Sequence, residues 1–282
     1  MSEEDRNSQP TRHRRAQWWW MSAAIVVVLV AATAVFTAQL QSDTAAPGTT
    51  TASPTTTATT TTRTTAPPTT TEPAPAGQYR LLWPFADEKQ AAAWQASYRT
   101  GGHQPWHLDA GLTAQSFTQG YLGYTTIDQV SATAISGADA QIGVGYKLPD
   151  GAMATAAVIH LIKVGSGQDA PWEVVGTQDV LDLTLTTPAY GSTVSSPMTV
   201  GGRITGVDES LRVKVLRLAE DKPVGQTSGI PAGGENTPWT AHVSFTAPAG
   251  VVLTVAVSTG GHINDVERFA ITGVRSGASV NG

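Results

Sequence analysis

The chain has 282 residues, no cysteine and a formal net charge of −5. The lack of cysteine excludes disulfide bonds, a thiol nucleophile and thiolate metal ligands, so any core must be held by apolar packing. Residues 78–282 carry 17 acidic and 12 basic side chains. This excess of negative charge argues against a nucleic-acid partner and against binding to an anionic lipid surface.

The first predicted element is an uncharged apolar segment over 18–38, whose 21 residues would cross about 30 Å of hydrocarbon as a helix. Trp18-Trp19-Trp20 stand at its start, where interfacial aromatic residues belong, and Arg12, Arg14 and Arg15 precede them. We therefore predict a single-pass signal-anchor, with a cytoplasmic tail over 1–17 and the C-terminal part extracytoplasmic. A cleaved signal peptide is the alternative, because Ala32-Thr33-Ala34 has the small-x-small form of a cleavage site.

A linker is predicted over 39–78. Its central part, 43–77, contains 16 threonines and 6 prolines and almost no large apolar side chain. Such a composition cannot offset the entropy of folding, so we expect a disordered, extended spacer. Tracts of this kind are also typical of O-glycosylated stalks, and the two interpretations are compatible.

An α+β domain, with two helices and then an antiparallel sheet, is predicted over 79–179. Asp87 is the expected N-cap of a helix over 88–99, with Gln90 in the capping-box position. A second helical pattern runs over 108–122. Its expected apolar side comprises Leu108, Leu112, Phe117 and Tyr121.

Alternating apolar residues predict the strands that follow. The expected turns are Gly137-Ala138-Asp139 and Pro149-Asp150-Gly151. The run over 154–164 is apolar on both faces and is expected to be covered on both. This order of elements, closed by Pro-Trp-Glu-Val-Val-Gly at 171–176, resembles the nuclear-transport-factor-2 and cystatin folds, in which helices pack on a curved sheet.

An all-β domain is predicted over 180–276, followed by a disordered tail over 277–282. Seven short alternating strands separated by turn signals favour an immunoglobulin-like β-sandwich. The alternating segments include 181–185, 198–200, 211–215, 241–245, 251–257 and 269–271.

The opening of this domain reads TPAYGSTVSSPMTVGG over 187–202, and Trp239 with Val243-x-Phe245 follows. It resembles the immunoglobulin-like domain of bacterial spore-germination and related envelope proteins, whose opening has the form P-x-x-G-x-x-V-x-S-P-x-x-V-x-G. The resemblance implies an extracytoplasmic, non-catalytic module with no catalytic residues to transfer. The whole layout resembles anchored envelope proteins of high-GC Gram-positive bacteria.

Three residues are the candidates for ligand binding: His107, Asp109 and His160. His107 and Asp109 belong to the polar cluster at 101–109, although Pro105 forbids a regular helix there and Asp109 can instead cap the second helix. His160 lies in the most apolar strand, where a core histidine is the simpler interpretation. In a cone-shaped fold it would line a pocket and, with Asp109 or Glu173, do acid–base work.

We therefore expect a membrane-anchored extracytoplasmic binding or scaffolding protein of the bacterial cell envelope, without catalytic residues, metal or cofactor. Its expected partners are the membrane, cell-wall polymer or envelope proteins, and no nucleic acid. The alternative is a small-ligand-binding protein or enzyme that uses a pocket in 79–179. A third possibility is a subunit of a larger envelope complex.

Overall fold

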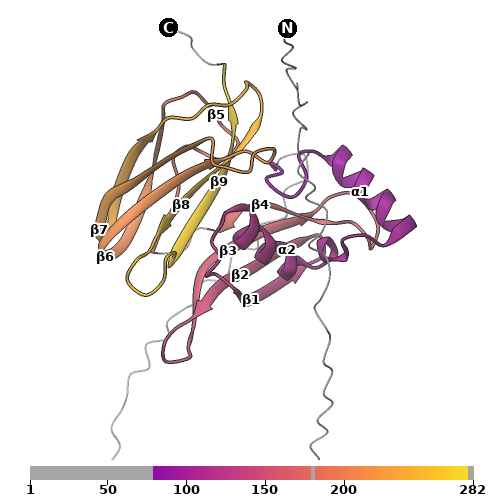
Figure 1. Cartoon of the computed structure of the whole chain (residues 1–282), viewed down its shortest axis with the longest axis horizontal. Coiled ribbons are helices and arrows are strands. Elements are labelled where there is room, and N and C mark those ends of the chain that lie inside the picture. The colour runs from indigo at the N-terminus through magenta and orange to yellow at the C-terminus, as the bar shows by residue number, and fades with distance from the viewer. Residues whose placement is uncertain (1–78, 179–181, 279–282) are drawn as a thin grey trace, which may run out of the picture. The chain divides into compact units, whose positions relative to one another are not determined.

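The computed structural model describes residues 79–178 and 182–278, which are mostly β-sheet with two α-helices (Figure 1). The predicted tail 1–17, anchor 18–38 and linker 39–78 lie outside these residues, as does most of the tail 277–282. Within the described residues, no helix has both the length and the apolar character needed to cross a membrane.

Helix α1, Glu88–Gly101, begins where the sequence predicts and ends two residues later. The Asp87 carboxylate accepts a hydrogen bond from the Gln90 backbone N–H at 2.8 Å, and the Gln90 side chain accepts one from the backbone N–H of Ala86 at 3.1 Å. The predicted N-cap is confirmed. Gly102 ends the helix in the left-handed region, with φ at 64°, where glycine meets no steric penalty.

The second predicted helix is divided into three short elements. They are a 3-10 turn η2, Pro105–Leu108, the helix α2, Ala110–Ser116, and a π-helical turn η3, Phe117–Tyr121. The prediction that Leu112 lies on the apolar side is wrong, because its side chain is 49% exposed. The buried face instead has the i, i+3, i+4, i+7 spacing of an amphipathic helix. It comprises Ala110, Thr113, Ala114 and Phe117.

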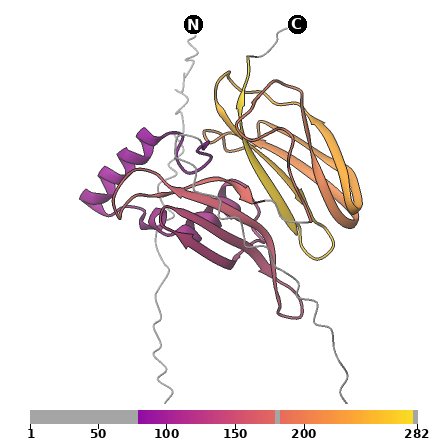
Figure 2. The same ribbon diagram turned by 180° about the vertical axis from the view of Figure 1, so that it is seen from behind.

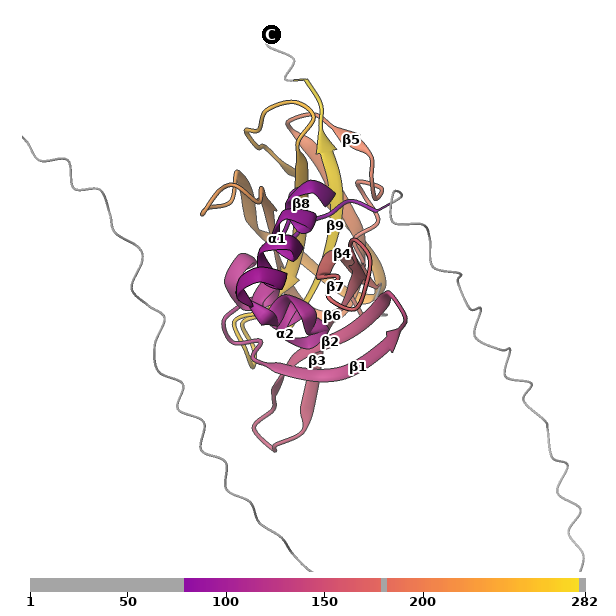
Figure 3. The same ribbon diagram turned by 90° about the vertical axis from the view of Figure 1, so that its right-hand side faces the viewer.

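The first sheet has four antiparallel strands in the order β1-β2-β3-β4. Their bounds are β1 Gln129–Ser136, β2 Asp139–Lys147, β3 Met153–Lys163 and β4 Trp172–Gln178. The turns lie where the sequence predicts them, and β1 forms an edge with strong curvature (Figure 3). A bulge shifts the β2–β3 register between Val144 and Gly145. Gly145 is required there, because a Cβ atom would lie 1.8 Å from the Ala154 carbonyl oxygen.

Both helices pack against this sheet. Ala114 and Phe117 of the α2 region share a core with Ile142, Ile159 and other side chains of one strand face. Ala91 of α1 joins a smaller core with Ile162 of β3 and Val175 of β4. These two side chains point to the opposite face of the sheet, because successive strand residues alternate between the faces. The sheet therefore buries apolar side chains on both faces, as predicted for the run over 154–164.

The second sheet has five strands in the order β5-β9-β8-β6-β7. Their bounds are β5 Thr193–Val194, β6 Met198–Leu216, β7 Gly225–Val243, β8 Val252–Thr259 and β9 Arg268–Ser276. The strands predicted at 198–200 and 211–215 are joined in the single long β6, because bulges let the β6–β7 hairpin continue. Figure 2 shows this long hairpin from behind. The pairing is compatible with a β-sandwich-like fold.

Strands β8 and β9 are apolar on both faces. Leu253, Val255 and Val257 point into a core formed within the five-stranded region, together with Trp239. The alternate residues Phe269 and Ile271 of β9 instead enter the core that contains Ile142, Ile159 and Phe117 of the four-stranded region. One continuous core therefore joins the two sheets.

Polar contacts reinforce this junction, which we call the seam. The Thr177 hydroxyl accepts a hydrogen bond from the Ile271 backbone N–H at 2.9 Å. The Lys214 ammonium group donates to the Leu122 carbonyl oxygen at 3.0 Å and lies 4.7 Å from the centre of the Tyr124 ring. The Tyr124 ring in turn packs against Phe269 at 5.2 Å between centroids.

Phe269→Ala tests the shared core. Removing this buried ring leaves a cavity that both sheets line, so we expect the free energy of unfolding to fall by about 3–5 kcal/mol. Urea unfolding followed by fluorescence and circular dichroism should show one transition by both probes. Ile263→Ala is the control, because Ile263 is 59% exposed and should change stability little. Two separate transitions in the unaltered protein would contradict a shared core.

Candidate functional site

His107 lies in η2 and is enclosed by aromatic side chains. Its ring stacks on Trp106 at 3.6 Å between centroids and meets the Trp94 ring edge-on at 4.9 Å, with Phe85 at 5.1 Å. The residue is only 3% exposed, and its Nδ1 atom has no hydrogen-bond partner. Burial lowers the pKa of His107 to about 4, so the imidazole is neutral at neutral pH. These surroundings give His107 a packing role.

Asp109 caps α2. Its carboxylate accepts a hydrogen bond from the Leu112 backbone N–H at 2.9 Å, which satisfies one of the free donors at the helix start. Its own carbonyl oxygen accepts from the Thr113 backbone N–H at 2.9 Å. The sequence analysis gave helix capping as the alternative role of Asp109, and the structure contains that cap.

His160 has a different partner from the two that the sequence suggested. Its Nε2 atom lies 2.6 Å from Oδ2 of Asp139, and the Tyr79 ring meets its ring edge-on at 5.3 Å between centroids. The pairing with Asp109 or Glu173 is therefore replaced by one with Asp139. We call this pair the His160–Asp139 dyad. His160 also lines a pocket of about 450 Å³ at the seam.

Sequence reasoning treated Asp139 only as part of a turn. The pairing follows from the β2–β3 register of the structure, which places Gln141 opposite His160 and Asp139 opposite Ile162. Residues two apart on a strand share a face, so Asp139 and Gln141 lie on the same face as His160.

Glu173 is the most deeply buried acid in the described residues. It is fully buried on β4, one carboxyl oxygen accepts from the Phe85 backbone N–H at 3.1 Å, and the other oxygen has no partner. Burial raises the pKa of Glu173 well above its usual range, because the charged form loses its hydration. The carboxyl group is therefore held in its protonated, uncharged form, which suits the apolar layer beneath α1.

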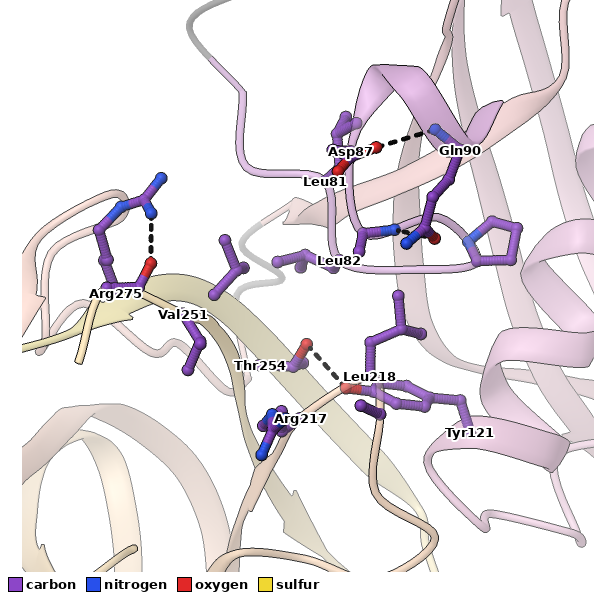
Figure 4. Close-up of a pocket in the computed structure, with 15 residues that line it drawn as sticks. Leu81, Leu82, Asp87, Gln90, Tyr121, Arg217, Leu218, Val251, Thr254 and Arg275 are labelled. Atoms are coloured by element: carbon purple, nitrogen blue, oxygen red, sulfur yellow. Dashed lines mark hydrogen bonds between the residues drawn. The ribbon is translucent and has the colours of Figure 1, made fainter. Parts of the chain in front are cut away.

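A cleft of about 730 Å³ lies at the seam, and we call it the seam cleft (Figure 4). The segment before α1, Tyr121 and the loops and strands of the five-stranded region all contribute to its wall. Its apolar lining comprises Leu81, Leu82, Pro84, Leu218, Val251 and Val252.

Two guanidinium groups line the seam cleft. Arg217 pairs with Glu220 at 3.0 Å, and Arg275 donates to the Gly250 carbonyl oxygen. Each guanidinium has five N–H donors, so these contacts leave several donors for a ligand. The one acidic side chain in the lining, Asp87, is engaged in the cap of α1. The seam cleft therefore combines an apolar surface with two guanidinium groups.

Tyr121 supplies a hydroxyl at the wall of the same cleft. It donates to the Thr254 hydroxyl at 3.4 Å, and burial raises the pKa of Tyr121 to about 12. The phenol therefore remains protonated and uncharged at neutral pH.

The described residues contain no group of three or more histidine, aspartate or glutamate side chains placed to hold a metal ion. No family model, no curated protein and no solved structure matches this chain. The resemblances to the immunoglobulin-like envelope domain and to the cone-shaped α+β folds therefore stay predictions.

Glu173→Gln tests the buried carboxyl. The raised pKa means that the folded state keeps a proton that the unfolded state releases above about pH 4.3, so stability should fall as the pH rises from there towards the folded-state pKa. Glutamine keeps the shape and cannot titrate. At pH values above about 4.3 we expect the variant to lose this decline.

The measurement is urea unfolding across that pH range. His107 contributes equally to both proteins, so their difference isolates Glu173. Glu220→Gln, the same change at a surface ion pair, is the control and should leave the slope as it is. An unaltered slope in Glu173→Gln would show that Glu173 is charged in the folded protein.

Proposed function

We propose that this chain is a membrane-anchored extracytoplasmic binding or scaffolding protein of the bacterial cell envelope, and that it acts without catalysis. The observation that supports this function best is the seam cleft, which is open in the folded chain and lined from both sides of one continuous core. A cleft on a rigid support can bind a partner with little loss of conformational entropy.

The proposal also assigns each of the two sheet regions to a type of module. The five-stranded region would be an immunoglobulin-like module of the spore-germination type, and 79–179 a cone-shaped α+β module. The predicted anchor at 18–38 and spacer at 39–78 would hold both outside the membrane.

The chemistry of the seam cleft defines the partner. An apolar lining with Arg217 and Arg275 suits an envelope protein segment that presents apolar side chains and a carboxylate. Cell-wall polymer is the other partner that the sequence suggests, and the same experiment separates the two.

Leu218→Glu tests the seam cleft. It places a negative charge on the apolar wall, so we expect retention of the partner to fall at least about tenfold. The full chain, solubilised in mild detergent, serves as bait for envelope extract and, separately, for isolated wall polymer. Ile263→Glu, the same change at an exposed leucine-sized side chain, should retain the partner. Equal retention by both variants would remove the seam cleft from the proposal.

The alternative function is small-ligand binding or catalysis in 79–179, and the His160–Asp139 dyad is the observation that favours it. Alanine substitution of His107, Asp109 and His160 separates the two. Loss of a ligand with stability intact would support a site. Loss of stability would support packing and capping roles, and co-purification of a stoichiometric partner would support a complex subunit.

A further inference from the structure

The seam contains a second hollow with chemistry unlike that of the seam cleft. This pocket of about 450 Å³ is lined by His160 and Tyr79 on one side and by residues of the five-stranded region on the other. Its volume lies in the range of small-ligand sites. Its lining includes neither lysine nor arginine, so it lacks the positive charge that an anionic ligand would need.

His160 forms the polar end of the pocket, and Asp139, which lies behind it and outside the lining, holds its ring in place. A carboxylate only accepts hydrogen bonds, so the Nε2 atom donates to Oδ2 across 2.6 Å. The side chains are only 19% and 22% exposed, and both lie on paired strands, which hold them in place. The Nδ1 atom of His160 keeps hydrogen-bonding capacity for a ligand.

Tyr190 provides a rigid aromatic surface. Its hydroxyl accepts from the Arg80 backbone N–H at 2.6 Å and donates to the Arg80 carbonyl oxygen at 3.3 Å, yet the residue remains 42% exposed. A ring already held in place loses little entropy when a ligand packs on it. Tyr79 adds a second ring beside His160.

Hydroxyl groups complete the lining. Thr186 and Thr272 come from the five-stranded region and Thr177 from β4. The Thr177 hydroxyl already accepts from and donates to the Ile271 backbone, so Thr186 and Thr272 supply the hydroxyls that can donate to and accept from a ligand.

We propose that this pocket binds a neutral sugar unit, presented by an envelope glycan. A sugar ring has an apolar C–H face that packs on an aromatic ring, and hydroxyl groups that pair with an imidazole and with threonine side chains. A purely apolar ligand would leave the His160 imidazole and the threonine hydroxyls without their hydration, and an anion would find no lysine or arginine in the lining. This pocket is distinct from the seam cleft, so the sugar proposal can be tested independently of the partner proposed for the seam cleft.

The test is saturation-transfer NMR and titration of the full chain with glucose, galactose, mannose and N-acetylglucosamine. The detergent must lack a sugar headgroup, because a maltoside or glucoside would compete. Ala189→Trp fills the pocket from an exposed position without removing a polar contact, and Asp139→Asn weakens the dyad. We expect each to lower the affinity for the bound sugar at least about tenfold.

Two matched controls locate the binding. Ala219→Trp fills the seam cleft instead, and Asp265→Asn alters the exposed ion pair with Arg212. Both should bind the sugar as the unaltered protein does. The proposal fails if no sugar binds, or if Ala189→Trp binds as well as the unaltered protein. It also fails if N-acetyltryptophanamide binds in the pocket and the sugars do not, since the site would then take an aromatic peptide side chain.

Discussion

The burial of β8 and β9 on both faces is the constraint on which the rest of the described structure depends. In β8, Leu253 and Val255 face one core while Ala256 faces the other, and in β9, Phe269 and Val274 divide in the same way. A strand that is covered on both faces cannot move toward one layer without leaving a void in the other. The seam is therefore fixed by packing density, in a chain that has no cysteine to staple it.

The seam could not be predicted from the sequence, and the reason lies in its side chains. In β8, Leu253, Val255 and Val257 alternate with Thr254 and Ser258, which is typical of a strand with one face in water. Both polar residues are about 1% exposed. Thr254 satisfies its hydroxyl by contact with Tyr121, which lies more than a hundred residues away in sequence. Serine and threonine fit both buried and exposed faces of a strand, so the hydrophobic pattern does not show whether they are covered. Only the fold shows which surface covers them.

The sequence was sufficient to predict those features that depend on contacts between residues close together in the chain. The caps formed by Asp87 and Asp109, and the turn at 149–151, depend on contacts within a few residues. The partner of His160 depends on register instead. Counting back from the turn places His160 opposite Ala140, but the bulge at Gly145 shifts the pairing by one residue to Gln141. A one-residue shift decides which side chains share a face, and the glycine that permits it is one of 28 in the chain.

The two hollows differ in chemistry although one strand serves both. Arg275 of β9 lines the seam cleft, while Ile271 and Thr272 line the pocket that contains His160. Ile271 and Arg275 share one face of β9, and the opposite face, which also carries Thr272, is held in the core by Ala270 and Val274. Since the strand that links the hollows cannot shift without disturbing that core, their spacing is set by the fold. If both proposals hold, a polymer that offers sugar units and a protein segment that offers a carboxylate would meet two surfaces at a fixed separation, as the proposed scaffolding function requires.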